Sequence, residues 1–387
     1  MVLTRRLMLA GLLGACAPGG RGTPQRPVAA PRPVANPRFE AWLRGFRARA
    51  AGRGIPAPVL DRALAGAGYL PEVVATAGKQ TEFVRSLEDN IALAASDARI
   101  RQGRAMLRRY RALFARLEAR FQVEAELLCA IWGHESIYGA RRGTLPVISA
   151  LASLAFAGQR AGFNEAQLIA ALKIVAAGEV APPAMLGSWA GAMGHMQFIP
   201  TTYLAYAVDF DVDGRRDIWG DDPTDALASA ANFLHRSGWR HGEPWGIEVR
   251  AGDGRDMQGR PPPDYPGAAL LAPLGTNGPA FRVFRNYRVL LRYNNAMSYA
   301  IGVGHLADRL AGGGPLQGRF PPDAEGLHLA QRKEIQTRLA ALGFDPGSTD
   351  GVIGPQTVAA IRAFQAARGL TVDGRASKAL LATLRRG

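Results

Sequence analysis

Glu135, a glutamate near the end of an apolar run, is the first residue of this chain that could do chemistry. Trp132, Ile137 and Tyr138 are among its neighbours in the sequence. Burial among such side chains disfavours the ionised form of a carboxyl, so we expect the pKa of Glu135 to rise toward neutrality. A carboxyl that keeps its proton at neutral pH suits a general acid. The alternative is a helix-end glutamate that faces solvent, and this stretch alone leaves both interpretations open.

His134 stands directly before Glu135 and raises the question of a zinc-binding helix. The metalloprotease pattern requires a second histidine four residues after the first. That position holds Tyr138, so the pattern fails. We therefore interpret His134 as a packing or hydrogen-bonding residue.

Residues 187–203 are a second candidate because they combine small residues with a polar amide and aromatic rings. Small residues let the backbone approach a ligand closely. The amide of Gln197 can both donate and accept hydrogen bonds. Trp189, Phe198 and Tyr203 offer flat faces for stacking against sugar rings. A packed turn rich in glycine and alanine would have the same composition, so the residue types alone do not decide its role.

A third candidate is an aspartate-rich loop with the spacing of a calcium site. Asp209, Asp211 and Asp213 occupy the first, third and fifth positions, and Gly214 the sixth, as in the opening of an EF-hand loop. The twelfth position departs from that pattern, because Gly220 stands where a bidentate glutamate is expected. The alternative is an Asp/Gly turn that caps the next helix. The aspartates that could close a metal site follow at Asp221, Asp222 and Asp225.

The N-terminus has the pattern of an export signal. Basic residues at Arg5 and Arg6 precede a short apolar stretch, which ends in Leu-Gly-Ala before Cys16. The stretch is too short to span a bilayer, which takes about 20 apolar residues. The setting of Cys16 resembles the bacterial lipobox, and the arginine pair suggests the twin-arginine export route. Residues 17–37 are rich in proline and glycine and are predicted to be an extended tether.

These features predict an exported, periplasmic protein that is anchored to a membrane by a lipid on Cys16. The predicted membrane is the outer membrane of a Gram-negative bacterium. The formal net charge of +15 suits a polyanionic partner. An exported protein rarely meets nucleic acid, so the cell wall or a membrane surface is favoured over nucleic acid. The second of the two cysteines, Cys129, lies in an apolar run and is interpreted as a buried structural thiol.

The elements that must position these residues are mostly helical. Apolar residues recur at helical spacing over most of the chain. Between residues 243 and 285 the pattern changes to short segments such as 246–250 and 281–284, which suggest a small sheet interrupted by prolines. For residues 164–175 we expect Asn164 to be the N-cap. The predicted helices are 96–120, 124–137, 164–175, 224–236 and 289–310.

A separate small domain is predicted at the C-terminus. A Gly-Gly-Gly-Pro sequence begins a linker over residues 312–326. Beyond it, the Asp-Gly pairs at 350–351 and 373–374 each lead into a helical stretch, as a turn before a helix does. With a first helix over 329–342, residues 327–387 are predicted to form a compact set of three helices.

Three motifs in order carry a resemblance to the lytic murein transglycosylase B family. They are residues 132–136, residues 190–200, and residues 292–295 with Tyr299, and the resemblance covers residues 39–310. It implies a lysozyme-like, mainly α fold with a small β element. It also implies cleavage of the MurNAc-β-1,4-GlcNAc bond of peptidoglycan with formation of a 1,6-anhydroMurNAc end. The partner would be a peptidoglycan glycan strand.

The resemblance assigns roles residue by residue. Glu135 becomes the catalytic acid/base. It implies no cofactor for catalysis, allows a structural calcium ion, and favours Asp225 as the residue that joins Asp209, Asp211 and Asp213 around it. The substrate-binding residues that it implies are Ser188, Gln197, Tyr293, Asn294, Tyr299 and Arg160.

Residues 327–384 resemble the peptidoglycan-binding domain type 1. The matching segments are residues 335–339, 342–344, 350–357 and 364–365. This resemblance implies wall binding without catalysis. The expected organisation is a signal peptide over 1–16, a tether over 17–37, a lysozyme-like domain over 38–311, a linker over 312–326 and a binding domain over 327–387.

Two other functions remain alternatives at this point. A non-catalytic lipoprotein that binds the wall could use a lysozyme-like scaffold, although such a scaffold could lose the carboxyl that Glu135 retains. A hydrolytic muramidase would differ only in the attacking group, which would be water in place of the sugar's own 6-hydroxyl. Ordinary glycosidases use two carboxyls. No second carboxylate stands near Glu135 in the sequence, which is compatible with a single acid/base.

Overall fold

The computed structural model describes residues 32–79, 85–158 and 160–386. Cys16, the signal segment and most of the predicted tether lie outside the described residues. The described residues divide into two compact units: residues 32–79 with 101–158 and 160–242, and residues 85–100 with 243–386. Helices dominate both, which confirms the mainly α fold class. Over the described ranges, no helix has the length and apolar character needed to cross a membrane.

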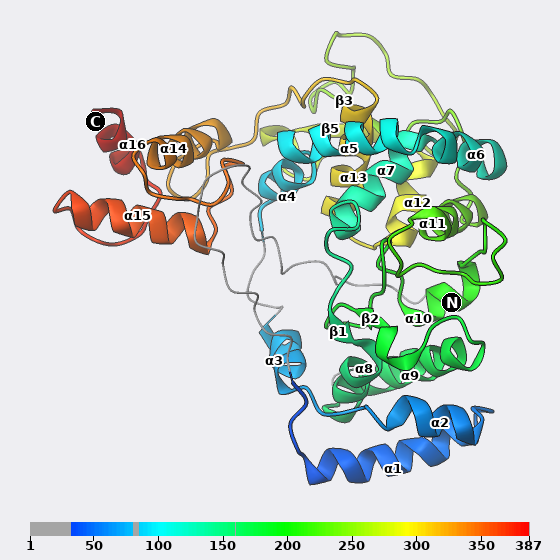
Figure 1. The fold of residues 1–387 in the computed structure, drawn as a ribbon. Helices are drawn as coiled ribbons and strands as arrows, with labels where there is room; N and C mark the ends of the chain where they lie inside the picture. Colours follow the sequence, from blue (N-terminus) through cyan, green and yellow to red (C-terminus); the bar gives the residue numbers. More distant parts are fainter. Residues whose placement is uncertain (1–31, 80–84, 159, 387) are drawn as a thin grey trace. The chain divides into compact units, whose positions relative to one another are not determined.

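The first unit is built from helices and one short β pair (Figure 1). The antiparallel pair joins β1 to β2 and brings Leu145 opposite Gly187. The bounds of its elements are α1 Pro37–Ala51, α2 Ala57–Leu64, α3 Pro71–Lys79, α6 Arg111–Phe121, α7 Ala125–Ser136, β1 Leu145–Pro146, α8 Val147–Phe156, α9 Ala161–Ala176, η1 Pro182–Ala184, β2 Leu186–Gly187, α10 Pro200–Tyr206 and α11 Thr224–Arg236. Helix α5, Asp97–Arg109, carries the chain from residues of the second unit into the first.

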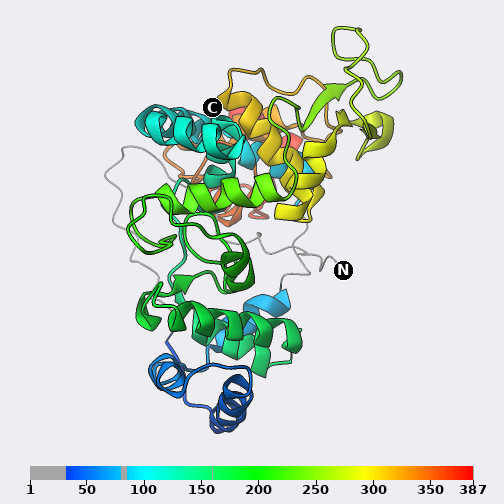
Figure 2. The same cartoon turned by 90° about the vertical axis from the view of Figure 1, so that its right-hand side faces the viewer.

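The core of this unit is built on two helices, α8 and α9, that bury long continuous runs of residues. In α8 every residue from Val147 to Ala155 is buried, and α9 buries the run from Gln167 to Leu172. A helix without a polar face must be covered all round. Accordingly α8 and α9 lie side by side, and α1 and α2 contact them from outside (Figures 1 and 2). This buried pair supports the β1–β2 ribbon that leads into residues 187–203.

Two serines in α8 accept hydrogen bonds from backbone N–H groups that pack against this helix. Ser149 and Ser153 are both buried, and their hydroxyls accept hydrogen bonds from the backbone N–H groups of Gly68 and Leu70 at 3.2 and 2.9 Å. Buried backbone donors need such partners, because an unpaired one costs about 1–3 kcal/mol. The α2–α3 connection is thereby fixed on the core.

The second unit contains a three-stranded antiparallel sheet in the order β3-β5-β4. Gly246 pairs with Val283, and Ala269 pairs with the same Val283 from the other side. The small sheet was predicted, but its edge strand β4 was not. The bounds are α4 Leu87–Ala94, β3 Gly246–Val249, β4 Ala269–Leu271, η2 Gly275–Asn277, β5 Ala280–Val283, α12 Arg285–Tyr293, α13 Met297–Leu310, α14 Leu329–Ala341, α15 Pro355–Ala367 and α16 Lys378–Arg386.

Several predicted helix boundaries are wrong for identifiable reasons. The helix expected over 96–120 is interrupted at Tyr110, which separates α5 from α6. The helix expected over 289–310 breaks at Asn294, whose extended backbone ends α12. Asn164 is not an N-cap, because α9 begins at Ala161 and buries Asn164 in its first turns. In the first two cases the apolar spacing used for the prediction did not mark the break, so periodicity alone could not reveal it.

The last residues of the predicted tether belong to the folded unit. Val34 forms an antiparallel bridge with Tyr69, and its N–H donates to the Tyr69 carbonyl at 2.9 Å. The Asn36 side chain accepts from the Phe39 N–H at 3.1 Å and caps α1. The described part of the chain therefore begins its folded structure before residue 37.

The three helices predicted for the C-terminal module are confirmed as α14, α15 and α16. Their buried residues form a core of their own, in which Phe344 meets Phe364 edge to face at 5.6 Å between ring centroids. Gly351 has a φ of +86°, and a Cβ there would lie 2.5 Å from Leu329. The Asp-Gly turn therefore needs its glycine for both backbone conformation and close packing. The core residues are Leu327, Ile335, Leu339, Ala360, Ile361, Phe364, Ala376, Leu380, Leu381 and Leu384.

The predicted linker is bound along the second unit. The carboxylate of Glu248, in β3, accepts hydrogen bonds from the N–H groups of Gln317 and Gly318 at 2.8 and 2.7 Å. Asp323 accepts from the N–H of Leu327 at 2.8 Å. Residues 317–323 are thus fixed by side chains at both ends, which the Gly-Gly-Gly-Pro composition did not indicate.

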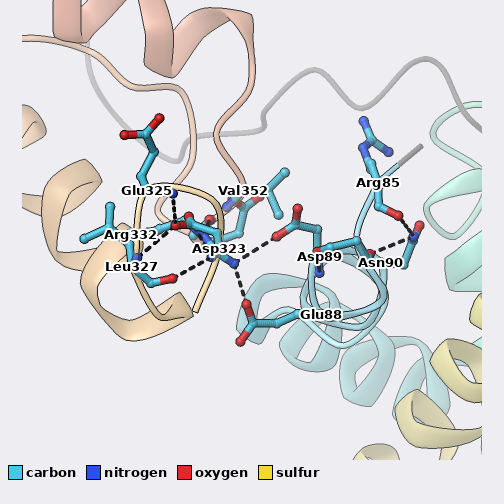
Figure 3. A network of polar contacts seen from close by, with 12 residues as sticks. Arg85, Glu88, Asp89, Asn90, Asp323, Glu325, Leu327, Arg332 and Val352 are labelled. Carbon is cyan, nitrogen blue, oxygen red and sulfur yellow. Dashed lines mark hydrogen bonds and ion pairs between the residues drawn. The ribbon is translucent and has the colours of Figure 1, made fainter. Parts of the chain in front are cut away.

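Arg332 joins the module to α4 (Figure 3). The guanidinium is 4% exposed and bonds the carboxylates of Glu88, Asp89 and Asp323 at 2.7, 3.0 and 3.1 Å. Its Nε donates to the Gly351 carbonyl at 2.8 Å. Burial alone would lower the pKa of Arg332, but the three carboxylates outweigh it and raise that pKa. A buried guanidinium is tolerated because its N–H groups find acceptors in this network.

Candidate active site

Helix α7 carries Glu135 in its last turn and ends abruptly one residue later. Ile137 and Tyr138 both adopt the left-handed conformation, with φ of 51° and 54°, and Gly139 follows at 86°. The N–H of Ile137 bonds the Gly133 carbonyl and that of Tyr138 the Trp132 carbonyl. Successive left-handed residues other than glycine are uncommon. They turn the chain sharply away from the helix end that holds Glu135.

Glu135 is a buried carboxyl that stands three residues from both Trp132 and Tyr138 in the sequence. It is 7% exposed, while Trp132 and Tyr138 are 2% and 6% exposed. The Trp132 ring meets Tyr138 and Tyr110 edge to face, each at 5.7 Å between centroids. The alternative of a solvent-facing glutamate is therefore wrong. The expected rise of its pKa stays a prediction.

Residues 187–198 fold as a tight double turn. Met193 bridges to Gly187 and to Phe198, and the Ser188 hydroxyl accepts from the Ala192 N–H at 3.1 Å. Gly191 has a φ of 78°, and a Cβ there would lie 2.6 Å from the Leu151 side chain. The stretch is thus the packed turn that its small residues also allowed, and Ser188 helps to hold it.

The side chain of Gln197 forms hydrogen bonds with backbone carbonyls of the first unit. Its amide nitrogen donates to the carbonyls of Arg142 and Gly194 at 3.0 and 2.8 Å, and its own φ is 50°. The turn of residues 187–198 is thereby joined to the segment after α7. Arg160 is exposed, and its guanidinium lies 4.4 Å from the centre of the Phe163 ring.

Tyr293, Asn294 and Tyr299 form a set within the second unit. The two tyrosine rings are buried and stack with centroids 6.2 Å apart and planes 5° apart. Asn294 is 9% exposed, and its buried Oδ1 has no hydrogen-bond partner among the described residues. The structure brings these three together and places the other predicted sugar-binding residues in the first unit.

Sequence reasoning missed two residues that contact the turn containing Glu135. The Ser136 hydroxyl donates to the His195 carbonyl at 2.6 Å and accepts from the Gly139 N–H at 3.0 Å. The His195 ring accepts from Trp132 Nε1 at 3.0 Å. The glycine at position 139 is the trace of this contact in the sequence, because a Cβ there would lie 2.5 Å from the His195 ring. The sequence alone does not show that His195 is the side chain that needs this space.

The aspartate loop groups three of its predicted ligands. Asp209, Asp211 and Asp213 each offer a carboxylate oxygen, and these oxygens all lie within 4.8 Å of one another. Calcium binds oxygens at about 2.3–2.6 Å, so ligands on opposite sides of one ion stand about 5 Å apart. The three carboxylates therefore fit a cation of that size.

Asp225 makes a different set of contacts from the other three aspartates. It is 2% exposed, and its two oxygens accept from the N–H groups of Phe210 and Asp217 at 2.7 and 2.9 Å. Burial raises the pKa of Asp225 to about 6 against the lowering by those amides, and the charges of Asp211 and Asp209 add to the rise. Asp225 therefore bonds backbone at residues 210 and 217, whereas Asp209, Asp211 and Asp213 form the carboxylate group.

Cys129 is fully buried in α7, as predicted. Its Sγ lies 3.5 Å from the Gly103 carbonyl oxygen, and burial raises the pKa of the thiol. A thiol in that state is a poor nucleophile. The prediction of a structural thiol is confirmed.

Comparison with known proteins defines the class. Residues 38–308 match the transglycosylase SLT domain, and residues 328–384 match the putative peptidoglycan-binding domain. The first match covers most of the chain, so this chain belongs to that transglycosylase family.

Individual relatives agree with this class. The chain is similar to membrane-bound lytic murein transglycosylase B of Escherichia coli (strain K12), with 31% identity over 212 residues. That match spans 49% of this chain and 58% of the relative.

Solved structures extend the likeness. The crystal structure of SltB3 from Pseudomonas aeruginosa in complex with NAG-NAM-pentapeptide has a TM-score of 0.71 and 45% identity, covering 90% of this chain and all of that one. The structure of Escherichia coli lytic transglycosylase Slt35 in complex with calcium has a TM-score of 0.60 and 26% identity, covering 71% of this chain and 93% of that one.

Proposed function

We propose that this chain is a lytic transglycosylase that cleaves the MurNAc-β-1,4-GlcNAc bond of peptidoglycan and leaves a 1,6-anhydroMurNAc end. The observation that carries the proposal is Glu135, a buried carboxyl in the last turn of α7, in a chain that belongs to the transglycosylase family. The solved SltB3 complex, at 45% identity, holds a NAG-NAM-pentapeptide. Its ligand supports a glycan strand with peptide stems as the substrate class.

One carboxyl can perform both proton transfers of this reaction. Glu135 in its protonated form donates a proton to the glycosidic oxygen as the bond to the anomeric carbon breaks. The resulting carboxylate then takes the proton of the muramyl 6-hydroxyl, whose oxygen closes on the anomeric carbon. The substrate's own acetamide can stabilise the developing positive charge. Glu135 ends protonated, so atoms and charge balance without a second carboxyl or a water.

Product mass tests this proposal. Sacculi digested with the protein should yield muropeptides that each weigh one water less than hydrolytic products. The control digest uses a lysozyme on the same sacculi and gives the hydrated masses. Hydrated products from this protein would contradict the transglycosylase and favour a muramidase. No soluble product at all would favour a non-catalytic wall-binding lipoprotein.

We also propose the six substrate-binding residues that the family resemblance implies. Ser188, Gln197 and Arg160 lie in the first unit, and Tyr293, Asn294 and Tyr299 lie in the second. Asn294 supports the proposal most directly, because its buried Oδ1 lacks a protein partner among the described residues and could accept from a sugar hydroxyl or amide. An Asn294→Ala variant should raise KM for short glycan strands more than it lowers kcat. An unchanged KM would remove Asn294 from the site.

The lipid anchor is proposed from the sequence around Cys16. The E. coli relative is named as membrane-bound, which supports a membrane attachment for this chain as well. A Cys16→Ala variant should leave the membrane fraction and keep its catalytic activity. Unchanged membrane fractionation would contradict the lipidation.

The C-terminal module is proposed to bind the wall without taking part in catalysis. Its match to the putative peptidoglycan-binding domain over residues 328–384 supports this division, as does its separate core. Deletion of residues 327–387 should weaken sacculus binding while leaving cleavage of short soluble strands largely intact. Equal losses on both substrates would mean that the module contributes to the catalytic site.

A further inference from the structure

His195 lies at the centre of a hydrogen-bond network around the last turn of α7. It is 3% exposed and belongs to the turn of residues 187–198. Its Nδ1 stands 3.0 Å from Trp132 Nε1, and its Nε2 stands 2.8 Å from the Gly220 carbonyl oxygen. Its backbone carbonyl accepts from the Ser136 hydroxyl at 2.6 Å. The His195 N–H also donates to the Ile218 carbonyl at 3.1 Å, so this one residue bonds α7 twice and residues 218–220 twice.

The partners of the ring fix its protonation. An indole N–H can only donate, so the Trp132 contact requires an unprotonated Nδ1 on His195. A neutral imidazole then carries its hydrogen on Nε2, where it donates to the Gly220 carbonyl. The contact of 3.4 Å between Arg142 and Nε2 places a positive charge beside the ring and is not a hydrogen bond in this tautomer. The network is satisfied only by neutral His195.

The charges around the ring agree with that state. Burial lowers the pKa of His195, and Arg142 lowers it further, against the raising effects of the Gly220 carbonyl, Asp217 and Asp221. The net direction is downward, so the ring holds its neutral form to a lower pH than an ordinary histidine.

The two contacts on α7 stand on either side of Glu135. Trp132 is three residues before it and Ser136 is the residue after it. Gly139 lets the returning chain pass the ring, because a Cβ there would lie 2.5 Å from His195 Cε1. The last turn of α7 is therefore held to the turn of residues 187–198 by a side-chain bond and a backbone bond from one residue.

The other side of the network is also fixed. The Gly220 carbonyl accepts from Arg142 as well as from His195, and Arg142 pairs with Asp221 at 2.7 Å. The N–H of Asp217 donates to Asp225 at 2.9 Å. His195 is thus anchored to a segment that is itself tied down.

We propose that neutral His195 is a positioning residue that holds the last turn of α7, and with it Glu135, in the orientation needed for proton transfer. The proposal rests on the proposed acid/base role of Glu135. A displacement of about 1 Å at a catalytic group can cost about a hundredfold in rate, so loss of this support should act on kcat. Substrate binding does not require the bond, so KM should change little.

Three substitutions separate the bonds of the ring. An asparagine side chain ends close to the position of Nδ1 and can still accept from Trp132. A glutamine side chain reaches the position of Nε2 and can still donate to the Gly220 carbonyl. A phenylalanine keeps a ring but makes neither bond.

We expect His195→Phe to lower kcat on soluble glycan strands by about 10- to 100-fold with little change in KM. His195→Asn should recover most of that loss, and His195→Gln should recover less, because the Trp132 bond acts directly on α7. The control is His241→Phe, the same substitution at an exposed histidine, which should keep wild-type kcat. Melting temperatures of all variants identify any that fail to fold, and for those the Asn variant carries the comparison.

The pH profile supplies a readout that a purely structural role would not move. Protonation of Nδ1 at low pH ends the Trp132 bond, so wild-type kcat should fall on the acid side, where Glu135 itself keeps its proton. Asparagine does not titrate, so the His195→Asn profile should lose that acid limb. An acid limb that is identical in both proteins would overturn the proposal.

A double-mutant cycle tests whether His195 acts through Glu135. In a Glu135→Gln background, His195→Phe should cause little further loss of kcat. Fully additive losses, or a His195→Phe variant with wild-type kcat, would overturn the positioning role. A Glu135→Gln variant with undiminished turnover would instead refute the proposed acid, so the two failures are distinguishable.

Discussion

The end of α7 and the aspartate loop both present carboxyls, yet they differ in nearly every physical respect. Glu135 is 7% exposed and lies near aromatic rings. Asp211 and Asp213 are exposed, and together with Asp209 they crowd three carboxylates within 4.8 Å. Burial disfavours a charge and favours a held proton, whereas crowded charges favour a cation. On our proposal, the surroundings of the carboxyl, more than its residue type, suit Glu135 to proton transfer and the aspartate loop to binding an ion.

The strongest test of this comparison removes the proton from the buried site. Glu135→Gln keeps the size and polarity of the side chain but cannot act as an acid, so turnover of glycan strands should fall by about 100- to 10,000-fold. Glu126→Gln, the same substitution in the first turn of α7, is the matched control and should keep its activity. Anhydro-product formation measures both. Near-normal turnover by Glu135→Gln would remove the distinction between the two regions.

Sequence reasoning identified these carboxyls because each lies in a local pattern. The apolar run around Glu135 predicts burial, and the alternating aspartates predict a cation loop. The role of Asp225 did not follow from spacing, because its contacts with the Phe210 and Asp217 N–H groups depend on how the loop closes. His195 was missed for the same reason, since its partners Trp132 and Gly220 are distant in sequence.

Prediction of the fold from the sequence has the same limit. The Asp-Gly turns of the module are local, and that prediction holds. The break at Tyr110 is not local, because the ring of Tyr110 packs on Trp132 of another helix. The linker looked free because Gly-Gly-Gly-Pro is a flexible composition, but Glu248 and Arg332 hold the residues that follow. Long-range polar contacts are what a single sequence does not reveal.

Carboxyls with a third kind of surroundings extend the comparison. Glu88, Asp89 and Asp323 form ion pairs with the buried Arg332. Arg332→Ala would leave these three carboxylates without their partner. We expect a loss of about 2 kcal/mol in the stability of the second unit, below the ~3–5 kcal/mol of a fully buried pair because the carboxylates keep some contact with water. Urea unfolding measures the change.

Arg375→Ala is the matched control for Arg332→Ala within the same module. Arg375 is exposed and pairs with Glu325 at 2.7 Å on the surface. Surface pairs contribute little, so this variant should unfold like the wild type. Equal destabilisation by the two substitutions would mean that burial of Arg332 adds nothing, and that the module is held by its other contacts.

Asp308 is another carboxyl whose surroundings act on its pKa. The residue as a whole is exposed, yet desolvation of its carboxyl raises the pKa to about 7, against the lowering by the Trp245 Nε1 hydrogen bond. The folded state therefore holds a proton that the unfolded state releases near its ordinary pKa of 3.8, so stability should fall as pH rises from about 4 to about 7. Asp308→Asn keeps an uncharged acceptor for Trp245 and should flatten that fall, as measured by urea unfolding across this range. Asp264→Asn, at a 91% exposed side chain, is the control and should leave the slope unchanged. An unaltered slope in Asp308→Asn would show that solvent at this exposed residue prevents the proton from being held.

The smallest expected effect is the response of the aspartate loop to calcium. Without a cation the three carboxylates repel one another, and the charges of Asp213 and Asp209 contribute, after burial, to raising the pKa of Asp211. Calcium that binds only the folded loop should raise the melting temperature as its free concentration increases. The Slt35 structure, solved with calcium at 26% identity, supports the test. The absent glutamate at the twelfth position predicts weak affinity, so the titration should reach millimolar calcium.

Asp211→Ala with Asp213→Ala should abolish the increment, whereas Asp61→Ala with Asp264→Ala removes two exposed charges elsewhere and should retain it. Activity of the wild type in excess chelator should persist, because the loop contributes no acid/base group. A melting curve that does not move in millimolar calcium would make the loop an Asp/Gly turn, with its carboxylates occupied by the N–H groups of Asp213, Gly214 and Arg215.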